Sequence, residues 1–110
     1  MKKTIVAIGA HLDDIELAAG GTLAKAVRDG HDVYMIVMSQ SGYTDYNGKV
    51  MRTDETAMQE GRNAARVLGV KELEILDFSN KDIAYDSRAV EAIEKRLNII
   101  KPDIIFTHWP

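Results

Sequence analysis

Short apolar segments alternate along this chain with longer segments in which apolar residues recur every three or four positions. The apolar segments lie at 5–8, 32–38, 73–78 and 104–107. The first is β-branched and unbroken by polar residues, which predicts a strand buried on both faces of a sheet. The segments between them predict three helices. The first stops before Gly30 and has its apolar positions at Leu17, Leu23, Ala24, Ala26 and Val27. The second is predicted at 52–68 and the third at 87–100.

Strands that alternate with helices predict right-handed βαβ units and a parallel sheet with helices on both faces. The sequence therefore predicts an α/β fold, a mainly parallel sheet in a three-layer αβα sandwich, with residues 1–110 in a single domain. The last predicted strand, 104–107, is followed by no helix. We therefore expect these residues to be the N-terminal part of a longer, truncated domain, and the uncovered strand to contact a partner.

Polar residues follow each predicted strand. They lie at 11–16, in a long segment at 39–49 that predicts a loop, at 80–86, and at His108. The carboxyl ends of parallel strands meet at one edge of a sheet, where ligands of such folds bind. We therefore expect these four groups to lie near one another.

Composition narrows the function classes. The 110 residues include no cysteine, so thiolate metal sites, disulfides and cysteine nucleophiles are excluded. The net charge of −3, without a basic stripe, argues against a nucleic-acid partner. No apolar run approaches the ~20 residues that span a membrane, and no secretory signal is present, so we expect a cytoplasmic protein.

The segment after the first strand carries the candidate chemistry. His11, Asp13, Asp14 and Glu16 lie within six residues. His11 and Asp14 are three apart, so in a helical turn both point the same way, and imidazole and carboxylate are good zinc ligands. Asp13 could then act as general base toward a metal-bound water. In the alternative interpretation, Asp13 or Asp14 caps the first helix and His11 packs against the sheet.

The segment Gly20-Gly21-Thr22 follows this cluster. It predicts a flexible turn near the helix start that lets the backbone approach a ligand. Close packing of the helix on the sheet is the alternative.

The segment 10–16 (AHLDDIE), followed by Gly20-Gly21-Thr22, resembles the signature A-H-P-D-D-x-E…G-G-T of the PIG-L/LmbE-like zinc-dependent N-deacetylases. The resemblance extends over the whole chain, including 64–69 and 102–108. It implies a Rossmann-like αβα sandwich, a Zn²⁺ cofactor, an N-acetylglucosamine-type glycoconjugate or related small molecule as substrate, and a homo-oligomer.

Carried over to this sequence, the resemblance implies that His11 and Asp14 are zinc ligands and that Asp13 is the general base. Leu12 stands where the family has proline. The family's third ligand lies in an H-x-D-H-like segment after the fourth strand, beyond Pro110. We therefore expect little or no deacetylase activity from these 110 residues alone, and we do not expect His108 to replace the missing ligand.

Three residues are candidates for substrate binding. The family holds its substrate with an arginine near the second helix and an aspartate after the third strand. The candidates here are Arg52, although the family arginine aligns nearer Ala57, and Asp82. His108 is expected to line the site. The alternatives are a solvated arginine at a helix start and an aspartate in a turn.

Other α/β classes fit less well. A phospho-receiver domain needs an aspartate at the end of the third strand, but Asp77 lies inside it. A dinucleotide-binding fingerprint needs a second glycine after Gly9, where His11 stands instead. A catalytically silent or partner-completed αβα domain, lacking the third ligand, stays open as the main alternative.

Overall fold

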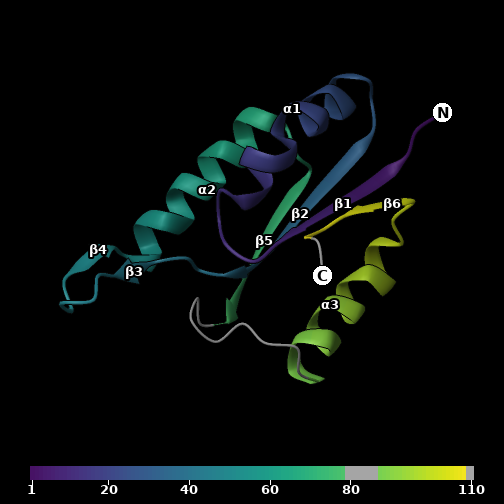
Figure 1. Cartoon of the computed structure of the whole chain (residues 1–110). Helices are drawn as coiled ribbons and strands as arrows, with labels where there is room; N and C mark the ends of the chain where they lie inside the picture. Colours follow the sequence, from purple (N-terminus) through teal and green to yellow (C-terminus); the bar gives the residue numbers. More distant parts are fainter. Residues whose placement is uncertain (79–86, 109–110) are drawn as a thin grey trace.

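The computed structural model of the chain describes residues 1–78 and 87–108. Four parallel strands form the main sheet, in the order β5-β2-β1-β6 (Figure 1). The strands of this sheet are β1 (Thr4–Gly9), β2 (Asp32–Ser39), β5 (Glu72–Phe78) and β6 (Ile104–Phe106). The helices are α1 (Asp14–Arg28), α2 (Asp54–Leu68) and α3 (Ser87–Ile100). The predicted α/β class with a parallel sheet is confirmed.

The helices form two layers, one on each face of the sheet (Figure 1). Helices α1 and α2 cover one face, where Leu23 and Ala57 pack with Val33 and Met35. Helix α3 covers the other face, where Ala89 packs against a separate cluster of strand residues. Side chains of β1 and β2 are buried on both faces, which explains why their apolar residues run without alternation.

The strand order reverses at β1. The chain passes from β1 outward to β2 and β5 on one side, and then returns through α3 to β6 on the other side of β1. Such a reversal opens a crevice at the carboxyl ends of the two strands that flank it. The residues that follow β1 and β6, His11 and His108 among them, therefore lie at the expected place for a ligand.

Two predictions for the first helix are wrong. Leu17, expected on the buried face, is 86% exposed, and Ile15 packs into the core instead. The segment Gly20-Gly21-Thr22 is not a turn, because it lies in the middle of α1, and a Cβ on Gly20 or Gly21 would meet no atom within 4 Å. Neither glycine is therefore required there by a close approach of the backbone.

A second correction concerns the segment predicted as a loop at 39–49. It contains part of an antiparallel hairpin, β3 (Tyr43–Thr44) paired with β4 (Val50–Arg52). Arg52, expected to open the second helix, ends β4. Helix α2 starts at Asp54 because the Thr53 hydroxyl accepts a hydrogen bond from the Thr56 amide (3.1 Å) and caps the helix, as predicted.

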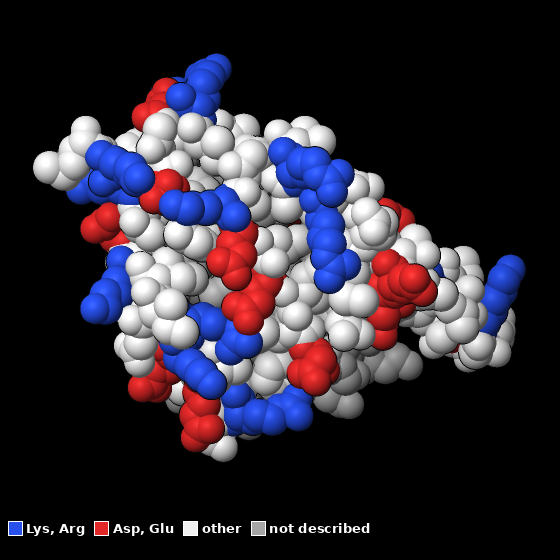
Figure 2. All heavy atoms as spheres, turned by 180° about the vertical axis from the view of Figure 1, so that it is seen from behind, with Lys and Arg blue, Asp and Glu red and all other residues white. Residues whose placement is uncertain are grey.

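Charged side chains of both signs are interspersed on the face seen in Figure 2, so this face has no extended basic surface. In the part of the chain that the structure describes, no helix is long and apolar enough to cross a membrane.

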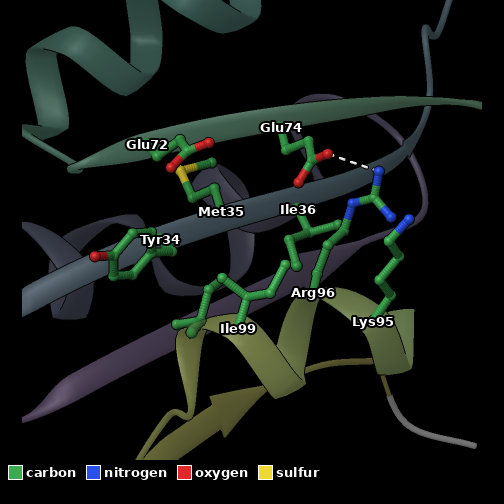
Figure 3. A pocket seen from close by; sticks show the side chains of 9 residues that line it. Tyr34, Met35, Ile36, Glu72, Glu74, Lys95, Arg96 and Ile99 are labelled. Atoms are coloured by element: carbon green, nitrogen blue, oxygen red, sulfur yellow. Dashed lines mark ion pairs between the residues drawn. The ribbon is translucent and has the colours of Figure 1, made fainter. Parts of the chain in front are cut away.

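A groove of about 320 Å³ lies between α3 and the sheet (Figure 3). Arg96 of α3 forms an ion pair with Glu74 of β5 (2.6 Å) across it. Tyr34 and Glu72, near the starts of β2 and β5, also line it. The groove therefore lies toward the amino ends of the strands, away from the polar residues that follow β1 and β6.

Candidate active site at the carboxyl edge of the sheet

His11 and Asp14 are brought together in the turn between β1 and α1. The His11 amide donates a hydrogen bond to Asp14 Oδ2 (3.0 Å), and His11 Nδ1 lies 3.7 Å from the same oxygen. Both side chains are partly exposed, at 40% and 32%. The spacing of three residues thus produces the predicted pair of donors, reachable from solvent.

The residue that follows β6 completes this side of the crevice. His108 Nε2 accepts a hydrogen bond from the Ala10 amide (3.0 Å) and lies 3.4 Å from Asp14 Oδ2. The contact joins the carboxyl ends of β1 and β6 directly. Because the Nε2 lone pair already accepts the Ala10 proton, this nitrogen is a poor metal ligand in the arrangement seen. The structure therefore places His108 beside Asp14, and its role as a wall residue of the site stays a prediction.

Asp13 points its carboxylate toward Arg52. Its φ of 85° is in the left-handed region, which is strained for a residue with a Cβ. Asp13 occupies the N-cap position of α1, as the alternative interpretation expects, but its side chain makes no capping hydrogen bond to the helix. Instead, Asp13 Oδ2 lies 3.4 Å from Arg52 Nη1, which also lies 3.9 Å from Glu60 Oε2. The strained backbone thus directs Asp13 to a cation.

Glu16 lies next to this pair, one turn into α1. Burial raises the pKa of the Glu16 carboxyl above its ordinary value, and repulsion from the Asp13 carboxylate raises it further. Glu16 Oε2 is buried and has no hydrogen-bond partner among the described residues. The Glu16 carboxyl is therefore harder to ionise than an ordinary glutamate.

Serines at the end of β2 hold the loop that carries these residues. The Leu12 amide donates to Ser41 Oγ (2.8 Å), and Ser41 Oγ donates to the Ser39 carbonyl (2.9 Å). Both serines are buried. The donor at position 12 exists only because leucine stands where the family has proline, which lacks an N–H. Sequence reasoning missed these serines, since nothing in a single sequence shows which amide they accept.

The donors present match part of a zinc site. His11 and Asp14 are of the types that zinc binds, but a catalytic zinc takes three protein ligands. Over residues 1–78 and 87–108, no three histidine, aspartate or glutamate side chains are arranged to hold a metal ion. The residue types therefore fit two positions of such a site. Asp82, predicted to bind substrate, lies outside the described residues.

Comparison with known proteins places this chain in a family. The family described as PIG-L, GlcNAc-PI de-N-acetylase, matches residues 6–110. The chain therefore belongs to the PIG-L family, which confirms the resemblance seen in the 10–16 segment.

Three relatives illustrate the relationship. A diacetylchitobiose deacetylase of Thermococcus kodakarensis is 26% identical over 98% of this chain, and the uncharacterized deacetylase YaiS of Escherichia coli is 37% identical over 72% of it. The crystal structure of the N,N'-diacetylchitobiose deacetylase from Pyrococcus horikoshii matches 94% of this chain with a TM-score of 0.82 and 27% identity. The matches cover 41%, 40% and 39% of those proteins, so this chain spans about two fifths of their length.

Proposed function

We propose that this chain carries two zinc ligands and the general base of an N-deacetylase that acts on an N-acetylglucosamine-type sugar or a related small molecule. The observation that supports this most is the single turn at the strand-order reversal, which brings His11 within 3.7 Å of Asp14 and presents Asp13 beside them. Membership of a de-N-acetylase family supplies the reaction class.

In this proposal, His11 and Asp14 hold the zinc ion. A bound zinc ion would polarise the amide carbonyl and lower the pKa of water to about 7. Asp13 takes the proton of the attacking water and returns it to the nitrogen as the C–N bond breaks, which releases acetate and the free amine. Arg52, whose Nη1 atom lies 3.4 Å from Asp13 Oδ2, holds the Asp13 carboxylate in place. Arg52, Asp82 and His108 remain the proposed substrate contacts.

A second candidate is the silent or partner-completed domain. It is favoured by the absence of a third suitably placed metal donor in residues 1–78 and 87–108. The two candidates differ in whether the protein binds zinc and releases acetate.

The test uses protein expressed from its full natural reading frame. Zinc is measured by elemental analysis, and acetate release is measured with N-acetylglucosamine and N,N'-diacetylchitobiose. We expect about one zinc per chain, which His11→Ala and Asp14→Ala remove. Asp13→Asn should keep the zinc and lower turnover by about 10²–10⁴-fold.

Each outcome of this test has a definite meaning. Zinc-free protein that releases no acetate from either sugar would establish the silent domain. Loss of zinc in Asp13→Asn would make Asp13 a ligand rather than the base. The 110-residue chain alone should release no acetate, and robust turnover by it would contradict the need for a third ligand outside it.

A further inference from the structure

The β3–β4 hairpin stands beside the candidate site and has a groove of its own. The groove has a volume of about 260 Å³ and is lined by Gly42, Tyr43, Thr44, Val50, Arg52, Thr53 and Asp54. Whole ligand sites measure about 300–1,000 Å³, so this groove suits one ring-sized group. In Figure 1 the hairpin projects from the start of α2, away from the main sheet.

The base of the hairpin is fixed to α2. Asp54 Oδ1 accepts a hydrogen bond from the Gly42 amide (2.8 Å). A Cβ on Gly42 would lie 2.5 Å from the Asp54 amide nitrogen, so only glycine allows this approach. The far end is fixed as well, because Asp45 Oδ1 accepts hydrogen bonds from the Asn47 and Lys49 amides (both 2.9 Å). The groove is therefore preformed.

Arg52 connects the groove to the candidate site. It lines the groove, and its Nη1 atom lies 3.4 Å from Asp13 Oδ2. A molecule in the groove is thus separated from the proposed general base by a single side chain. The Nε atom of Arg52 is buried and has no hydrogen-bond partner among the described residues.

The remaining lining suits a sugar ring. Tyr43, half exposed, offers an aromatic face for the C–H groups of a pyranose, and Val50, 58% exposed, offers a second apolar contact. The Thr44 hydroxyl and the Arg52 guanidinium can bond sugar hydroxyl groups. Among the described residues that line the groove, Asp54 is the one with a carboxylate, and it already accepts the Gly42 amide.

We propose that the groove between Tyr43, Val50 and Arg52 binds a second sugar unit of an N-acetylated oligosaccharide, next to the unit whose amide is cleaved beside Asp13. This proposal rests on the proposed deacetylase function, which it deepens by naming where the rest of the substrate lies. It predicts that a disaccharide binds more tightly than a monosaccharide, and that the gain depends on the hairpin.

The test measures binding of N-acetylglucosamine and of N,N'-diacetylchitobiose by calorimetry, with protein from the full reading frame that carries Asp13→Asn so that the sugars are not cleaved during the titration. Catalysis is not required, so failure of this proposal is distinguishable from failure of the deacetylase function, which acetate release reports. We expect the disaccharide to bind at least about 10-fold more tightly than the monosaccharide, because its second ring makes additional favourable contacts in the groove. Tyr43→Leu should abolish this gain and leave monosaccharide binding unchanged, whereas Tyr43→Phe should retain the gain.

Two further variants separate the groove from the fold of the hairpin. Val50→Phe keeps the Tyr43 ring but fills the groove, and should also abolish the gain. Tyr46→Leu is the matched control, because Tyr46 is 97% exposed on the same hairpin and does not line the groove. Equal affinities for the two sugars, or a gain that survives both Tyr43→Leu and Val50→Phe, would overturn the proposal. The proposal would also be overturned if these variants changed only the sedimentation coefficient of the protein, because the hairpin would then form a contact between protein chains.

Discussion

The Arg52 guanidinium lies 3.4 Å from the Asp13 carboxylate and joins the end of the β3–β4 hairpin to the turn that precedes α1. The Arg52 side chain is 20% exposed, and the Asp13 side chain is 53% exposed. A mostly buried cation therefore holds a carboxylate that solvent and substrate can reach. We propose from this relationship that Arg52 positions Asp13, in addition to making the substrate contact expected from the sequence.

We expect Arg52→Gln to lower kcat by about 10²-fold, because a small displacement of a catalytic group has an effect of that order. Zinc content should stay unchanged, since Arg52 contacts neither His11 nor Asp14 in the structure's ion pairs. The measurement is kcat and KM for acetate release together with zinc analysis.

Arg62→Gln is the matched control for this variant, because Arg62 is an exposed arginine on the adjacent helix α2. It should leave kcat and KM unchanged. A rise in KM with unchanged kcat in Arg52→Gln would show that Arg52 only binds substrate and does not position Asp13.

The sequence predicts the main sheet because its central strands are buried on both faces and leave a continuous apolar signal. The hairpin was missed because β3 has two residues and β4 three, too few for a periodicity. The pair Asn47-Gly48 is the signal that could have revealed it, since this dipeptide favours hairpin turns and Gly48 has a φ of 84°.

The place of the candidate site was predictable from the strand ends, which bring His108 to within 3.4 Å of Asp14, but individual contacts were predictable only between residues close in sequence. His11, Asp13 and Asp14 lie on one turn, so their spacing predicts their proximity. The contact of Asp13 with Arg52 spans 39 positions, and that of Ala10 with His108 spans 98. Such contacts depend on strand order and on the course of the hairpin, neither of which a local pattern specifies. Leu17 was misplaced because α1 begins directly after the strained Asp13, which turns Ile15 toward the core.

Replacing Leu12 with the family's proline should destabilise this chain. Proline removes the amide that donates to the buried Ser41 Oγ, and it removes a side chain that is only 4% exposed. We expect a loss of about 3 kcal/mol in the free energy of unfolding, from the packing and the hydrogen bond together. Leu12→Ala, which keeps the amide, should lose about 1 kcal/mol less. Equal losses in urea unfolding would show that the hydrogen bond contributes nothing.

Leu12 also determines which residue α2 tolerates at position 61. A Cβ on Gly61 would collide with Leu12 Cδ2, so Gly61→Ala should destabilise the chain by about 1–2 kcal/mol. In a Leu12→Ala background the space is open, and the same substitution should stabilise α2 by up to about 1 kcal/mol through helix propensity. The measurement is a double-mutant cycle by urea unfolding.

Gly21→Ala serves as the control for this cycle, because a Cβ there meets nothing within 4 Å. It should stabilise α1 by about the same propensity difference in both backgrounds. Gly61→Ala effects of the same sign with and without Leu12 would contradict the collision.

The ion pairs of Asp32 should make the free energy of unfolding depend on pH in the acid range. Lys2 Nζ lies 3.2 Å and Lys71 Nζ 3.6 Å from Asp32 Oδ2. Hydrogen bonding to Lys2, with the charges of both lysines, lowers the pKa of the Asp32 carboxyl from its ordinary value. A carboxyl whose pKa is lower in the folded state stabilises it above the unfolded pKa. This contribution disappears as the pH falls through the folded pKa. Asp32→Asn should therefore lower stability at neutral pH and have no effect in strong acid.

The measurement compares urea midpoints of the natural chain and Asp32→Asn from about pH 6 down to about pH 2, where the protonated carboxyl no longer differs in charge from the amide. The difference should shrink steadily over the acid part of this range. It should also be smaller at high salt, because the pair is near the surface and mobile ions screen it. A difference that stays constant with pH would show that Asp32 acts through its hydrogen bonds as a neutral group would, and not through its charge.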